Sequence, residues 1–114
     1  MKRSVPLTSE DKSTIKKIVE TVSELTYVHE KDIMGRKRDA EIVDARHLVW
    51  FFCVRFARIP MVACATHFKV THGAVHYGHR ALGYRLILDE TGHMKRTMDK
   101  IAKELKCEHL AEMI

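Results

Sequence analysis

The sequence predicts one all-α domain of about six helices over residues 1–114, and three observations support this fold class. Gly and Pro are scarce, at five and two of 114 residues, so few positions interrupt a helix. Val, Ile and Thr do not alternate with polar residues over any long window, as they would in half-buried strands. Hydrophobic residues make up 46% of the chain, which is enough for a real core, and no low-complexity run favours disorder.

Two helices are expected before the first glycine. Thr8 is a natural start for the first, because Asp11 completes a capping-box-like T-x-x-D. A short second helix is expected over about 29–34, and Gly35 ends it. The residues that should face the core from the first helix, at helical spacing, are Ile15, Ile18, Val19, Val22 and Leu25.

The third helix, from residue 39 or 40 to about 57, is expected to be the central one. Trp50 and Phe51 widen its apolar surface beyond a single stripe. The stripe that should be buried consists of Ile42, Ala45, Leu48, Val49, Phe52 and Phe56.

Three more helices are expected in the second half. Pro60 suits the first turn of a helix over about 60–68. Thr71 is a natural N-cap for the next helix, over about 72–88. Thr91 and Gly92 then break the chain before a last helix over about 93–113. The inner residues of these last two helices should be Val75, His79, Leu82 and Leu86, followed by Met94, Met98, Ile101, Leu105 and, near the end, Leu110.

The net charge of +5 is unevenly distributed along the chain. Residues 1–85 hold fifteen Lys and Arg against nine Asp and Glu, whereas residues 86–114 hold five against six. The excess of positive charge therefore accompanies the central helices. A basic pI alone is weak evidence of an anionic partner. The concentration of positive charge in one region of the chain favours such a partner.

Two neighbouring features indicate the chemistry of this region. Arg36, Lys37 and Arg38 stand consecutively between two helical patterns, and residues 68–80 read F-K-V-T-H-G-A-V-H-Y-G-H-R. The latter opens a helix, at Thr71, with small and hydrogen-bonding side chains. Cations beside such a helix start suit duplex DNA, because phosphates set the register while the helix end reads base edges in the major groove.

These pieces, in this order and spacing, resemble a known family. The segment D-I-M-G-R-K-R, the I-V-x-A-R that begins the long helix, and F-x-x-x-H-x-A-V-x-x-x-x-R are similar to the C-terminal DNA-binding domain of the bacterial replication initiator DnaA. The likeness covers about residues 13–88. It implies a Trp-repressor-like helical fold with a helix-turn-helix at about residues 60–88.

The resemblance implies a role for each cation near the expected interface. By position, Arg38 is the first choice for the arginine that enters the minor groove, and Arg36 is the second. Arg46 matches an arginine that touches the phosphate backbone, and it lies six residues before Phe52, so it is expected to be exposed. The other cations expected at the minor groove or at phosphates are Lys37, Lys69 and Arg80.

The resemblance also places the major-groove contacts, and here the chain departs from the family. Thr71, His72, Gly73 and Ala74 occupy the base-reading positions, with His76 one turn later. The histidine is kept, but Thr71 replaces an aspartate and Gly73 and Ala74 replace two threonines. The turn is also about one residue shorter. The likeness therefore supports DNA binding well and the family's usual nine-base-pair site poorly.

The resulting hypothesis is a non-enzymatic, sequence-preferring binder of double-stranded DNA without a cofactor, acting in replication initiation control or transcription regulation. The family's initiator carries an ATPase module upstream, but the sequence has no G-x-x-x-x-G-K-[ST], so it holds no phosphate cradle for ATP. The chain is expected to be a stand-alone regulator or a fragment of something longer.

Two alternatives stay open at this point. The substituted Gly73 and Ala74 allow a protein-interaction module that kept the fold and lost DNA specificity, with a protein partner on the last helix. A metal-binding regulator is the other, because C-x-x-H and H-x-x-x-H pairs resemble zinc-ligand spacing, although helical periodicity separates these residues. The residues of that pattern are Cys64, His67, His72, His76 and His79.

The cysteines and the absence of long apolar runs indicate a compartment. Cys53, Cys64 and Cys107 are an odd number without a framework spacing, so they are interpreted as reduced thiols. The sequence shows no apolar run of the ~18 residues that a membrane span needs and no signal-peptide core. A cytoplasmic protein associated with the nucleoid is expected.

Overall fold

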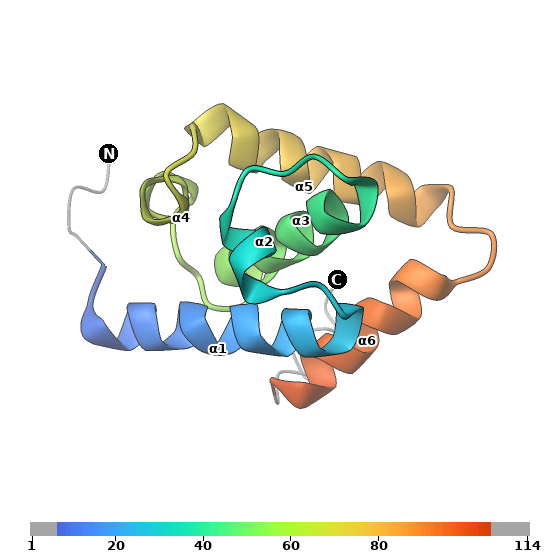
Figure 1. The fold of residues 1–114 in the computed structure, drawn as a ribbon, viewed down its shortest axis with the longest axis horizontal. Coiled ribbons are helices and arrows are strands. Elements are labelled where there is room, and N and C mark those ends of the chain that lie inside the picture. The colour runs from blue at the N-terminus through green and yellow to red at the C-terminus, as the bar shows by residue number, and fades with distance from the viewer. Residues whose placement is uncertain (1–6, 106–114) are drawn as a thin grey trace.

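The computed structural model describes residues 7–105, and all regular secondary structure within that range is helical (Figure 1). The predicted all-α class is confirmed. The six helices in chain order are α1 (Ser9–Thr26), α2 (Glu30–Met34), α3 (Ala40–Arg55), α4 (Met61–Phe68), α5 (His72–Ile87) and α6 (His93–Glu104).

The N-terminus of α1 forms as its sequence predicts. The Thr8 hydroxyl accepts the Asp11 backbone N–H at 3.0 Å, and the Asp11 carboxylate accepts the Thr8 backbone N–H at 3.2 Å. This reciprocal capping box satisfies two donors that a helix start leaves unpaired. The helix ends at Tyr27, which adopts the left-handed conformation with φ of 61°. The core residues predicted for α1 are buried, apart from the half-buried Leu25.

The central position predicted for α3 is confirmed. It lies between α1 and α5, with α2 and α4 against its other sides (Figure 1). Because neighbours surround it, every residue from Ala45 to Cys53 is buried. The buried surface extends beyond the predicted stripe to Trp50 and Phe51, as expected, and also to the polar Arg46 and His47, which was not expected.

The helix-turn-helix consists of α4, a three-residue turn and α5. Lys69 ends α4 in the left-handed conformation, with φ of 59°, and its N–H donates to the Ala65 and Thr66 carbonyls. Thr71 is the N-cap of α5, as predicted, and its hydroxyl accepts the Ala74 N–H at 3.0 Å. Pro60 stands one residue before the start of α4 rather than inside its first turn.

Helix α5 crosses α3 at very close range because of Gly78. A Cβ atom at this glycine would lie 2.9 Å from His47 Cδ2 and 2.9 Å from Trp50 Cε3, closer than packed carbon atoms approach. The missing side chain therefore sets the separation between the two helices, and through it the height of α5 above the core. Val75 and Leu82 bury the rest of this contact.

Helix α6 packs against α1 and α5 and completes the core. Gly92, with φ of 76°, precedes it, and the Asp89 carboxylate accepts the N–H groups of Met94 and Lys95 at 2.9 and 3.3 Å. Met94, Met98 and Ile101 are buried, so this methionine stripe belongs to the core. The expectations for Cys107 and Leu110 and for the predicted helix beyond 105 lie outside the described residues.

Candidate nucleic-acid interface

The basic loop between α2 and α3 is held from beneath by Arg46. Its Nε donates to the Ile33 carbonyl at 2.9 Å, its Nη1 to the Lys37 carbonyl at 3.0 Å and its Nη2 to the Asp32 carbonyl at 2.9 Å. Two of these carbonyls belong to the end of α2, where a helix leaves its last carbonyls short of N–H partners; Asp32 also accepts the Gly35 N–H at 3.1 Å. Arg46 thus donates to the carbonyls of Ile33 and Lys37 and adds a second hydrogen bond to the carbonyl of Asp32.

The expected exposure of Arg46 is wrong, since only 9% of the residue is exposed. Burial lowers its pKa from the ordinary value, and the nearby Arg36 charge acts in the same direction while Asp32 opposes it. A guanidinium nevertheless keeps its charge in proteins. The guanidinium of Arg46 directs its donors at three carbonyls. The expected phosphate contact of Arg46 assumed an exposed side chain, and the structure does not support that assumption.

The three cations of the loop have different partners. Arg36 Nη2 donates to the Lys69 carbonyl at 3.0 Å, which joins the loop to the turn before α5. Lys37 Nζ lies 3.4 Å from the Asp32 carboxylate. Arg38 is exposed and makes no hydrogen bond or ion pair with residues 7–105. Among the three, Arg38 is the cation left available for an external anion.

The first turn of α5 presents most of the predicted base-reading residues to solvent. Thr71, His72, Gly73 and His76 are exposed. Ala74 is different, because it is half buried and packs against the hydrophobic core. The Thr71 hydroxyl accepts a backbone N–H as the cap and keeps its own O–H to donate, while the His72 and His76 rings have no hydrogen-bond partner among residues 7–105.

The exposed face of α5 continues past its first turn. Arg80 is exposed, without a hydrogen bond or ion pair to the described part of the chain. Tyr77 is 67% exposed, and its ring lies edge-on to the buried His47 ring with a centroid separation of 6.2 Å. The sequence interpretation did not select Tyr77. The sequence did offer a reason to select Tyr77, because it is a large aromatic residue that directly follows His76 and lies outside the predicted inner face of the helix.

Two further histidines, His47 and His79, pack inside the fold. His47 is buried beneath α5, and this burial is the main cause that lowers its pKa to about 4. His79 is half buried, with its Nδ1 3.0 Å from the Val75 carbonyl. Cys64 is fully buried in α4 whereas His72 is exposed, so the C-x-x-H and H-x-x-x-H pairs do not converge. Within residues 7–105, no three His, Cys, Asp or Glu side chains are grouped as metal ligands.

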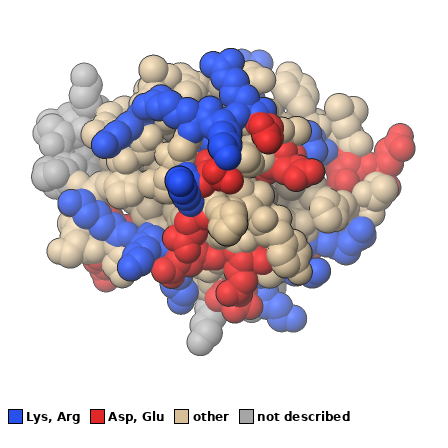
Figure 2. Space-filling view, viewed as in Figure 1, with Lys and Arg blue, Asp and Glu red and all other residues tan. Residues whose placement is uncertain are grey.

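Positive charge gathers on the face that carries these residues. In Figure 2 the Lys and Arg side chains cluster in the upper part of the view, over the basic loop and the neighbouring part of α5. Asp and Glu side chains lie mostly below and to the right of that cluster. The surface therefore presents a positive area around the loop and the turn, which suits a polyanion.

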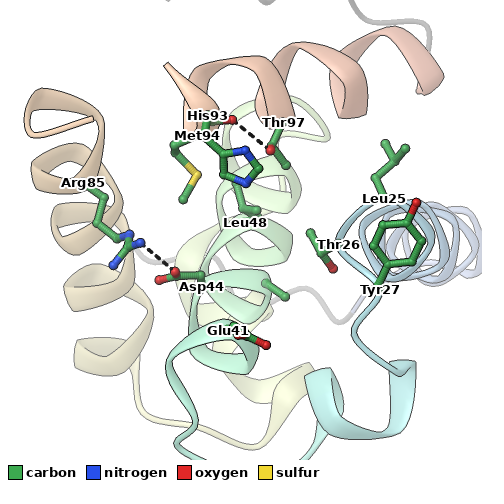
Figure 3. Close-up of a pocket in the computed structure, with 11 residues that line it drawn as sticks. Leu25, Thr26, Tyr27, Glu41, Asp44, Leu48, Arg85, His93, Met94 and Thr97 are labelled. Atoms are coloured by element: carbon green, nitrogen blue, oxygen red, sulfur yellow. Dashed lines mark hydrogen bonds and ion pairs between the residues drawn. The ribbon is translucent and has the colours of Figure 1, made fainter. Parts of the chain in front are cut away.

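The opposite end of α5 has a different character. Arg85 is paired with Asp44 of α3 at 3.0 Å (Figure 3). The pair stands in a groove of about 240 Å³ whose apolar floor includes Leu48 and Met94, with Tyr27 at its edge. Burial raises the pKa of Asp44, and the Arg85 charge opposes that shift. This end anchors α5 to the core.

Comparison with known families decides what this arrangement is. The family model described as the bacterial dnaA protein helix-turn-helix matches residues 15–82, which is more than half of the chain. The chain belongs to this family. The match starts in α1 and ends within α5, so it includes the basic loop and the helix-turn-helix of the DnaA domain.

The DnaA family assignment identifies the chain as a DNA-binding helix-turn-helix domain. No curated protein and no solved structure matches the chain. In residues 7–105, no helix has the length and apolar character needed to cross a membrane.

Proposed function

We propose that the protein binds double-stranded DNA with a sequence preference, as a regulator of replication initiation or of transcription on nucleoid DNA in the cytoplasm. The first turn of α5 enters the major groove, where His72 and His76 contact bases. Arg38 enters the adjacent minor groove. Lys69 and Arg80 hold phosphates on either side of the α5 entry.

One observation carries the proposal: an unpaired arginine lies in a loop bonded directly to the turn that begins α5. A helix start and a neighbouring arginine arm that reach two adjacent grooves are a recurring arrangement in proteins that read duplex DNA. Arg38 supplies such an arm. Charge alone supports only non-specific binding, whereas the exposed His72 side chain supplies a group able to distinguish bases.

The base preference should differ from that of a DnaA domain with an aspartate and two threonines at these positions. Gly73 offers no side chain, and Ala74 packs on the core. The first turn of α5 therefore lies close to the groove floor with few hydrogen-bonding groups. We expect a shorter or less stringent site in the major groove, centred on His72.

A salt titration on random duplex DNA tests binding itself. The affinity should fall steeply as salt rises, because each phosphate contact releases a counterion. A salt-independent or absent interaction would favour a protein-interaction module instead. Selection of bound sequences from a random pool then defines the preferred site.

The His72→Ala variant tests the base contact. It should weaken binding to the selected site by about 1–3 kcal/mol and binding to random DNA by less. An equal loss on both would make His72 a phosphate ligand, and no loss on either would exclude this helix face from the interface. Fluorescence anisotropy with labelled duplexes measures both affinities.

A further inference from the structure

The loop and the helix-turn-helix are separate in sequence but bonded to each other in the fold. The bond from Arg36 to the Lys69 carbonyl joins residues 33 positions apart. Lys69 is the left-handed residue that ends α4, so its carbonyl orientation is set by the geometry of the turn itself. The loop is therefore held relative to the first turn of α5 and not only to its own flanking helices.

Arg46 holds the same loop from its inner side. Its guanidinium contacts the carbonyls of Asp32 and Ile33, at the end of α2, and that of Lys37, between the other two loop cations. Because Arg46 belongs to α3, these bonds attach the loop to the central helix. Arg38 follows Lys37 directly and is left exposed, so its backbone is fixed on one side while its side chain is free.

The geometry points to Arg36 as a positioning residue that, with Arg46, holds Arg38 at a set distance from His72, so that the protein selects DNA by the number of base pairs between its minor-groove and major-groove sequences. This inference rests on the proposed function. It changes the role expected for Arg36, which acts on the position of another arginine and is not itself the minor-groove arginine.

The spacing of the two contacts is a sensitive quantity in duplex DNA. One inserted base pair moves the two sequences apart by ~3.4 Å and rotates them by roughly 34°, since a turn contains about 10.5 base pairs. A loop held at both sides cannot follow that displacement and loses its groove contact. A loop released from the turn has more freedom to follow it.

A selection experiment with matched variants tests the inference. Wild-type protein, Arg36→Ala and Arg80→Ala each select from the same random duplex pool, about three helical turns long. Both variants remove one exposed positive charge, but only Arg36 is bonded to the turn. Wild type and Arg80→Ala should enrich two sequence blocks at one spacing. Arg36→Ala should enrich the same major-groove block with the second block at several spacings or absent.

Affinity for designed duplexes provides a second measurement, made on the wild-type protein and on Arg36→Ala. One base pair inserted between the two blocks should weaken wild-type binding about tenfold, comparable to a mismatched base pair, and should weaken Arg36→Ala binding about threefold or less. Melting curves establish that the variants are folded.

The outcomes are distinguishable. A single spacing for Arg36→Ala, or wild-type binding that tolerates the insertion, would overturn the positioning role while leaving DNA binding in place. Enrichment of one block only by the wild-type protein would also overturn it, because the loop would then read no sequence. If the wild-type protein enriches nothing, the proposed function itself fails.

Discussion

At the scale of single residues, arginines with the same charge have different surroundings. Arg46 is buried and donates to three main-chain carbonyls, whereas Arg80 is exposed and has no polar partner among residues 7–105. Removing the Arg46 side chain takes a donor from the Ile33 and Lys37 carbonyls, whereas removing the Arg80 side chain breaks no hydrogen bond among residues 7–105. The two positions therefore separate folding from DNA contact.

The Arg46→Ala variant should be destabilised by roughly 2–4 kcal/mol, because charged hydrogen bonds are lost and the Ile33 and Lys37 carbonyls lose their donor. Urea unfolding measures this. Arg80→Ala is the control: its stability should stay within about 0.5 kcal/mol of wild type, while its DNA affinity falls and its salt slope decreases by about one. Wild-type stability in Arg46→Ala would mean that the loop does not depend on this residue.

The buried His47 makes stability depend on pH. Its pKa is about 4 in the folded protein, against 6.5 for a free histidine, chiefly because of burial and then because of the charges of Arg46, His79 and Arg85. At pH values between these two pKa values, His47 is protonated in the unfolded chain but not in the folded protein. Stability is therefore unaffected above about pH 6.5 and is lost as pH falls towards 4, by on the order of 3 kcal/mol.

The His47→Gln variant tests that contribution through urea unfolding at pH 7, 6, 5 and about 4.5. Its free energy of unfolding should decline less steeply below pH 6.5 than that of wild type. Some slope should remain, because burial also lowers the pKa of His79 and His67. Identical slopes in the two proteins would show that His47 is accessible to protons in the fold.

At the scale of elements, α5 is held at three points along its length. Thr71 caps its start, Gly78 lets its middle approach α3, and Arg85 pairs with Asp44 near its end. The exposed His72 and His76 thus project from a helix whose position is determined by packing. This rigidity is what a helix needs in order to read base edges in a fixed register.

Two glycines of α5 form a matched pair for testing the close crossing. Gly78→Ala should destabilise the protein by roughly 1–3 kcal/mol, because the added Cβ meets the His47 and Trp50 rings. Gly83→Ala has nothing within 4 Å of the new atom and should stabilise it by about 0.4–1 kcal/mol through reduced freedom of the unfolded chain. Denaturant midpoints measure both, and a stable Gly78→Ala would contradict the close contact.

At the scale of the whole molecule, α3 connects the parts of one core. Helices α1, α2, α4 and α5 all pack on it, and Phe52, in its last turn, is 1% exposed and stacked on Phe56 with a centroid separation of 4.8 Å. The basic loop and the helix-turn-helix are therefore attached to a common support. A substitution that destabilises α3 should therefore weaken the major-groove contact and the minor-groove contact together.

The Phe52→Ala variant should lose roughly 3–5 kcal/mol of stability through lost burial and a residual cavity. Ile87→Ala is the control, since Ile87 is 79% exposed and its loss should change stability by no more than about 0.5 kcal/mol. Thermal and urea unfolding provide the values. Equal stability of the two variants would contradict the central role of α3.

The sequence by itself determined the helices and their ends. A cap or a stop acts within a few residues, so the Thr8 and Thr71 caps, the stop at Gly35 and the break at Gly92 could be predicted from local patterns. The DnaA likeness was also visible, because it depends on the order of short motifs. The exposed His72 and Arg38 followed from those motifs and from polar positions outside the apolar stripes.

Only the tertiary structure decided which cations are free and how closely the helices cross. Periodicity placed Arg46 away from Phe52 and made it appear exposed, but α2 and the loop cover that side of α3. The bond from Arg36 to Lys69 and the contact of Gly78 with His47 join residues more than 30 positions apart. Such contacts depend on how all the helices pack at once, and a pattern within one helix does not contain that information.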